Sequence, residues 1–90
     1  MSDTILQEEA AVKKQIIKTN SLIIFNDDIN TFDFIIESLI KVCKHEMVQA
    51  EQCTWIIHYN GKCAVKNGDI ESLNPMKRAL CERGIDAKIN

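Results

Sequence analysis

The chain has 90 residues, of which 46% are hydrophobic and 27% charged, so it fits one soluble globular domain and leaves no room for a second. Its formal charge of -2 disfavours a nucleic-acid surface, and no apolar run approaches the ~18 residues of a membrane span. The acidic N-terminus does not have the basic-then-apolar order of a signal peptide, so we expect a cytoplasmic protein.

The first elements in chain order are an arm and a strand. Residues 1–19 are rich in Gln, Glu, Ala and Lys, which predicts a mobile arm; the alternative is a short amphipathic helix over about 6–14. The domain itself is expected over residues 20–90. It begins with Ser-Leu-Ile-Ile-Phe at 21–25, a run rich in β-branched and aromatic residues that ends in Asn-Asp-Asp, which is typical of a buried strand followed by a turn.

Two helices are predicted next. From Thr31 the apolar residues follow helical spacing over about 31–44, and Asn30 is the expected N-cap. A second helix is expected over 47–59, ended by a left-handed C-cap at Asn60-Gly61. Its apolar residues at helical spacing are Met47, Ala50, Cys53, Ile56 and Ile57.

The remaining chain predicts a strand, a helix and a last strand. Residues 62–66 alternate as a strand does, and a turn follows. Asn74-Pro75 is typical of an N-cap and a first helical residue, so the third helix is expected to begin there and to end at Gly84. Alternation over 85–89 predicts the last strand. This order predicts a two-layer α+β domain in which helices cover one face of a three-stranded sheet.

An acidic segment follows the first predicted strand. Between Asn26 and Glu37 the chain carries Asp27, Asp28 and Asp33 without one Lys or Arg, which favours binding of a cation. Loops between rigid elements commonly carry binding groups. The same residues are also ordinary turn and capping chemistry, so both interpretations stay open.

A histidine on the second predicted helix is the other candidate. Thr54, Ile57 and His58 are spaced i, i+3, i+4, so they share a face as the edge of a pocket would. Alternatively, His58 hydrogen-bonds the end of its own helix. Trp55 and Tyr59 are expected to pack rather than to recognise a ligand.

The chain offers little for catalysis or metal binding. An enzyme would pair His58 with Asp27 or Asp28 as an oriented base, but no convincing nucleophile or metal completes such a site. No two cysteines have the two-to-four-residue gap that places two thiolates on one metal. We therefore expect no enzyme, no metal and no cofactor, and we interpret four residues as small buried hydrophobes. They are Cys43, Cys53, Cys63 and Cys81.

The acidic turn and the histidine occur together in a known family. Ile-Phe-Asn-Asp-Asp at 24–28 before a helix, then Ile-His-Tyr-Asn-Gly at 57–61 closing the next, resembles ClpS, the adaptor of ATP-dependent Clp proteases. The resemblance covers about residues 20–90. It implies an adaptor that binds the free N-terminus of substrate proteins and delivers them to a Clp AAA+ unfoldase.

The resemblance also implies which residues bind. It places the N-terminal amine on Asn26, Asp27, Asp28 and His58. It places a pocket for a bulky hydrophobic first side chain between Asn30, Phe32, Ile35, Thr54 and Ile57. A terminal ammonium has a full charge and three donors, which suits carboxylate and imidazole acceptors. The chain departs from the family at two places, since the family commonly has Thr-Pro-Met at 30–32 and Met at 54.

The same resemblance implies contacts with the unfoldase. Contact with its N-terminal domain would use Glu71 and a basic residue near Met76 or Lys77. Residues 1–19 correspond to the flexible extension that engages the unfoldase during delivery. An alternative of the same fold is the C-terminal domain of the ribosomal stalk protein. That domain lacks the Asn-Asp-Asp and His pair, so the pair favours ClpS.

Overall fold

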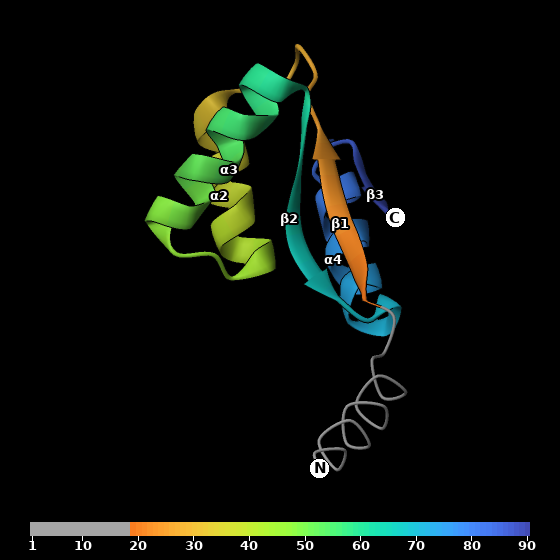
Figure 1. Ribbon diagram of the computed structural model, residues 1–90. Helices are drawn as coiled ribbons and strands as arrows, with labels where there is room; N and C mark the ends of the chain where they lie inside the picture. Colours follow the sequence, from red (N-terminus) through yellow and green to blue (C-terminus); the bar gives the residue numbers. More distant parts are fainter. Residues whose placement is uncertain (1–18) are drawn as a thin grey trace, which may run out of the picture.

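The computed structural model describes residues 19–90, so the predicted arm at 1–19 lies almost wholly outside it and stays a prediction. The elements are, in order, β1 (Asn20–Phe25), α2 (Phe32–Cys43), α3 (Met47–Asn60), β2 (Lys62–Gly68), α4 (Ile70–Glu82) and β3 (Ala87–Ile89) (Figure 1). This confirms the predicted order of strand, helix, helix, strand, helix and strand.

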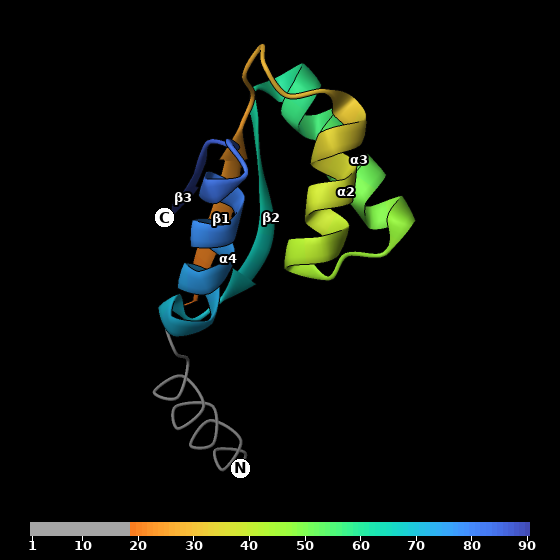
Figure 2. The same cartoon turned by 180° about the vertical axis from the view of Figure 1, so that it is seen from behind.

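The strands form one antiparallel sheet in the order β2-β1-β3, so the first strand of the domain is the central one. Along β1, Leu22 and Ile24 are fully buried, whereas Ile23 and Phe25 on the opposite face are half-buried. The helices cover the face of Leu22 and Ile24, as predicted. In Figure 1, α4 lies behind the sheet, and in Figure 2 it lies in front.

The core lies between this face of the sheet and the helices. Leu39 of α2 and Leu73 and Leu80 of α4 are buried in the same cluster as Leu22 and Ile24. α3 packs on β2, and α2 contacts α4 and β2. Because β1 is central, its C-terminal end meets both the end of α3 and the segment after α4. This position makes the loop after β1 a junction of three parts of the chain.

The N-terminal end of α2 and the C-terminal ends of α3 and α4 are capped in different ways. Thr31, rather than the predicted Asn30, caps α2, because its Oγ1 accepts a hydrogen bond from the N–H of Phe34 at 3.1 Å. The side chain of Asn30 is used elsewhere in the loop. The predicted left-handed residue after α3 is confirmed at Gly61, whose φ is 92°, and Gly84 after α4 has a φ of 84°.

The prediction that α4 begins at Pro75 is wrong. The helix begins at Ile70, and Asp69 caps it by accepting a hydrogen bond from the N–H of Ser72 at 3.0 Å. Pro75 therefore lies inside the helix, where it has no N–H to donate to the carbonyl of Glu71. The preference of proline for a first helical turn misled the prediction, and Asp69 directly after a turn was the better signal.

The cysteines are free, and their burial varies. Cys43 is buried, Cys53 and Cys63 are half-buried, and Cys81 is exposed, so the interpretation as buried hydrophobes is wrong for Cys81. Burial raises the pKa of Cys43 to about 11 and that of Cys63 to about 12, which keeps both thiols protonated. Across residues 19–90, every helix falls short of the length and apolarity that a membrane span requires.

Candidate functional site

The loop between β1 and α2 is built around the carboxylate of Asp27. Its Oδ1 accepts hydrogen bonds from the N–H groups of Ile29 and Asn30, both at 2.9 Å, and its Oδ2 accepts one from Asn30 Nδ2 at 2.9 Å. The bond from the Asn30 backbone is the main reason why the pKa of Asp27 lies below its usual value. Since a carboxylate has about four lone-pair sites, Asp27 stays ionised and keeps an acceptor position for a ligand.

Two further hydrogen bonds join this loop to distant parts of the chain. The N–H of Asn26 donates to the carbonyl of Gly61 at 2.8 Å, which joins the loop to the end of α3. Asn30 Nδ2 also donates to the carbonyl of Gly84 at 2.9 Å, which joins it to the end of α4. Asp28 is exposed and forms no hydrogen bond or ion pair within residues 19–90. The loop is therefore fixed, while one of its carboxylates is unpaired within that range.

A cavity of about 290 Å³ opens between this loop, α2 and α3. The loop supplies polar groups, the two helices supply most of the apolar wall, and His58 comes from the last turn of α3. The residues that line the cavity are Asn26, Asp27, Asp28, Asn30, Phe32, Ile35, Thr54, Ile57 and His58. The structure thus brings together all nine residues that were predicted for the amine and for the hydrophobic pocket, although they come from two separate segments.

The wall of the cavity is mainly apolar, and the Thr54 hydroxyl in it is hydrogen-bonded within its own helix. Thr54 Oγ1 donates to the carbonyl of Ala50 at 2.7 Å, so this hydroxyl is satisfied within α3. Ile35 and Ile57 are buried. The ring of Phe32 packs edge-on against Trp55, with 4.7 Å between ring centroids, which braces this part of the wall against α3.

His58 lies exposed at the rim of the cavity. Its ring packs edge-on against Phe32 and Tyr59, at centroid distances of 6.3 and 5.1 Å. Within residues 19–90 the imidazole forms no hydrogen bond. The end of α3 is instead closed by the N–H of Gly61, which donates to the carbonyl of Ile57 at 2.9 Å. The alternative that His58 hydrogen-bonds the end of its helix therefore has no support in this geometry.

The exposure of several side chains on α3 differs from the sequence prediction. Trp55 and Tyr59 do pack on each other, with parallel rings 5.1 Å apart, but both are exposed. Met47 and Ile56, which the spacing assigned to the apolar face, are also exposed. Because α3 carries apolar residues on both faces, helical spacing could not indicate which face is buried.

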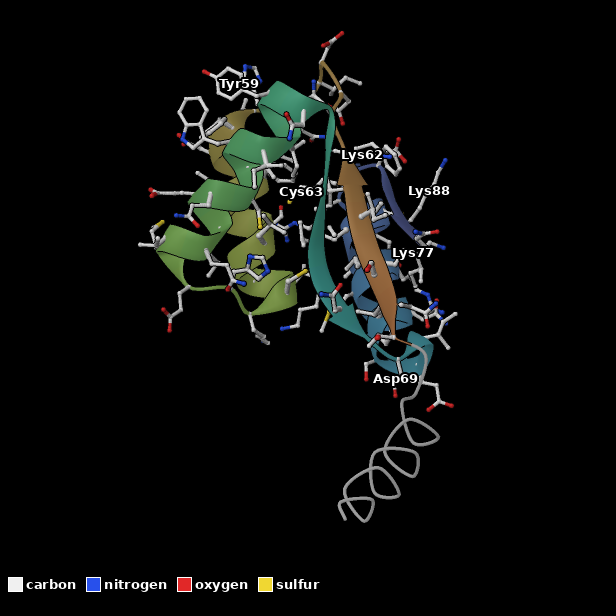
Figure 3. The ribbon with its side chains drawn as sticks, viewed as in Figure 1. Tyr59, Lys62, Cys63, Asp69, Lys77 and Lys88 are labelled. Carbon is white, nitrogen blue, oxygen red and sulfur yellow. The ribbon has the colours of Figure 1, made fainter. Side chains whose placement is uncertain are left out.

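The two residues predicted to contact the unfoldase lie on α4, away from the cavity. Glu71 is exposed in the first turn, and Lys77 is half-buried about one and two-thirds turns later. Figure 3 shows Lys77 and Tyr59 well separated. The structure therefore does not join these two residues to the cavity, and their role stays a prediction.

Comparison with known proteins decides the family. A family model described as ATP-dependent Clp protease adaptor protein ClpS matches residues 8–86. The chain belongs to the ClpS family. ClpS adapter proteins from Campylobacter jejuni, strains 81-176 and RM1221, are each 32% identical to it over 65 residues, which cover 70% of this chain and 67% of theirs. Membership of the ClpS family disfavours the ribosomal-stalk alternative.

A solved structure shows that the fold is also that of a ClpS protein. Agrobacterium tumefaciens ClpS2 bound to L-phenylalaninamide superposes with a TM-score of 0.74 at 16% sequence identity. The match covers 81% of this chain and 95% of the ClpS2 chain.

Proposed function

We propose that this member of the ClpS family binds the free N-terminal residue of substrate proteins in the cavity and delivers them to a Clp AAA+ unfoldase. The observation that carries the proposal is the cavity itself, in which a fixed acidic loop and the His58 imidazole adjoin an apolar wall. A terminal ammonium finds acceptors in Asp27, Asp28 and His58. The first side chain, if bulky and hydrophobic, enters between Phe32 and the buried isoleucines.

The ligand of the similarly folded ClpS2 supports this chemistry. L-phenylalaninamide combines a free α-amine with an aromatic side chain and an amide. The cavity offers acceptors for the amine and an apolar wall for the side chain. Among the residues that line it, the hydroxyl of Thr54 already donates to Ala50, so no free hydroxyl faces His58 as a nucleophile. The proposed role is accordingly one of binding without catalysis.

The expected affinity follows from ordinary magnitudes. About three hydrogen bonds to a charged group contribute roughly 1.5–3 kcal/mol each. A buried Leu or Phe side chain adds roughly 1.5–3 kcal/mol. Once the cost of association is subtracted, a Kd of about micromolar order is expected.

Peptides that differ only at their first residue test the proposal. A peptide that begins with free Leu, Phe, Tyr or Trp should bind, and the N-acetylated form, or one that begins with Glu or Gly, should bind at least about tenfold more weakly. Fluorescence anisotropy measures these affinities. His58→Ala should weaken binding of the Leu peptide, whereas Cys81→Ser, at an exposed position of α4, serves as the control. Equal affinities across the peptide set would contradict the proposed function.

A further inference from the structure

The outer face of α3 carries an apolar stripe that nothing else in residues 19–90 covers. Four apolar side chains there follow the spacing i, i+7, i+8 and i+11, which places them on one side of the helix. They are Val48, Trp55, Ile56 and Tyr59, with 63%, 47%, 41% and 72% of their surface exposed. The residues of α3 that face the core, Ala50, Thr54 and Ile57, are buried. We call these four exposed residues the α3 outer stripe.

The α3 outer stripe begins at the mouth of the cavity. The ring of Trp55 contacts Phe32 and lies 6.3 Å from His58, while Tyr59 lies 5.1 Å from His58, measured between ring centroids. Phe32 and His58 both line the cavity. Figure 3 shows Tyr59 at the end of α3 nearest the site loop, directed away from the sheet. Apolar surface therefore continues from the cavity rim onto Trp55 and Tyr59 on the outside of α3.

The length and chemistry of the stripe fit a short extended segment. Tyr59 and Val48 are separated by about 16 Å along the helix axis, at ~1.5 Å per residue. An extended chain covers that distance in about five residues. The stripe contains no charged residue, and the side chain that interrupts it, Gln52, is neutral. Apolar side chains are thus the complementary ligands.

We propose that the α3 outer stripe binds apolar side chains of the substrate segment that follows the first residue, at about positions two to six. The inference rests on the proposed function, because the cavity must hold the N-terminus for the following residues to reach the stripe. A second copy of the chain, or a folded partner domain, seated on the stripe would cover Trp55 and Tyr59 at the cavity mouth. Continuity with the cavity therefore favours the substrate itself as the occupant.

Two series of peptides, all beginning with free Leu, test the inference. One series continues with Phe, Ile and Val alternating with Ser, and the other continues with Ser and Gly alone; each has members of two, four, six and ten residues. For the six-residue members, the apolar peptide should bind at least about fivefold more tightly than the Ser-Gly peptide. The gain should grow with length and stop at about six residues.

A variant with three substitutions, Val48→Ser, Ile56→Ser and Tyr59→Ser, removes most of the stripe at exposed positions. It should bind the apolar series only as tightly as the Ser-Gly series, while affinity for the Ser-Gly series and the need for a free amine stay unchanged. Ile70→Ser on α4, where the side chain is 49% exposed, is the matched control and should change neither series. If the triple variant fails to fold, the two series on the unaltered chain still decide the question.

Three results would overturn the inference. Equal affinity of the two series would do so and would leave the proposed function standing. A dimer in sedimentation velocity that the triple variant abolishes would assign the stripe to a second copy. Loss of unfoldase binding in the triple variant, with both peptide series unaffected, would assign it to the unfoldase. If no free-amine peptide bound at all, the proposed function itself would be contradicted.

Discussion

Asn30 is the residue on which the shape of the site loop depends. Its side chain donates to Asp27 and to the carbonyl of Gly84, and its backbone N–H donates to Asp27 as well. A residue that looked like a helix cap in the sequence therefore orients the carboxylate proposed to receive the substrate amine. The neighbouring Thr31 performs the capping instead, so the two roles can be separated by mutation.

Asn30→Ala should weaken binding of a Leu-initiated peptide by about tenfold, because Asp27 loses a bond that orients it. The same change removes two hydrogen bonds worth about 0.5–1.5 kcal/mol each, so the free energy of unfolding should fall by about 1–3 kcal/mol. Anisotropy and urea denaturation measure the two effects.

Thr31→Ala is the control for this prediction. Loss of the N-cap costs about 1 kcal/mol of stability but leaves every hydrogen bond to Asp27 in place. Peptide affinity should then stay within about twofold of the unaltered chain, since the binding groups are unmoved. An equal loss of affinity in both variants would show that affinity follows stability rather than loop geometry.

At the scale of elements, a buried histidine anchors the connection between α2 and α3 to the sheet. His45 is 4% exposed, and its Nε2 donates to the carbonyl of Val65 in β2 at 2.7 Å. Its Nδ1 has no partner within residues 19–90. Burial is the main reason why the pKa of His45 lies below its usual value, and the bond to Val65 opposes that effect. The folded chain therefore holds this imidazole neutral.

Stability should consequently fall on acidification. As the pH falls, the unfolded chain takes up a proton at His45 near the ordinary histidine pKa of about 6.5, whereas the folded chain does so only at a lower pH. The stability that this difference contributes is fully present above the unfolded pKa. It is lost as the pH falls toward the lower pKa of the folded chain. Urea denaturation from pH 7.5 to 5 should show the decline, at no more than about 1.4 kcal/mol per pH unit for one group.

Two substitutions of histidine by glutamine test this prediction. His45→Gln keeps a donor for Val65 but cannot titrate, so it should flatten the decline. His58→Gln, at an exposed position, should leave the decline in place. An unchanged slope in His45→Gln would contradict the assignment.

Secondary structure was predictable where one local signal dominated. The unbroken apolar run at 22–25 leads to a central strand, and Asn60-Gly61 leads to a left-handed helix end. The start of α4 was not predicted, because the preference of proline for a first turn outweighed the capping signal at Asp69. In the folded chain the buried Leu73 and Leu80 fix α4 on the sheet, and packing of this kind tolerates a proline inside a helix.

The nine cavity residues were predictable only in combination. Taken singly, the acidic turn and His58 each have an ordinary structural explanation, and it was the resemblance to ClpS that joined them. The hydrogen bonds from Asn30 and the contact of Phe32 with Trp55 depend on tertiary packing, so no local pattern indicated them. The exposed side of α3 was missed for a related reason, since its apolar residues satisfy helical spacing on both faces.

At the scale of the whole molecule, binding and delivery should be separable. All buried core side chains of the described chain lie between Leu22 and Ala87. Deleting residues 1–17, whose composition predicts a mobile arm, should leave peptide affinity within about twofold, because the residues proposed to bind lie between Asn26 and His58. It should block degradation of an N-terminally tagged substrate by the cognate Clp protease. Degradation assays and circular dichroism check this, and retained degradation would show that the arm is not needed for delivery.

The hydrogen bonds that fix the site loop also affect the rates at which the proposed substrates bind and dissociate. Asn26 is bonded to Gly61, Asn30 to Gly84, and Asp27 to its own loop, so the loop has little freedom left to lose when a ligand arrives. Association should then be similarly fast for every acceptable N-terminus. Discrimination between first residues would reside in how long each complex lasts, and residence time would set the interval available for handover to the unfoldase.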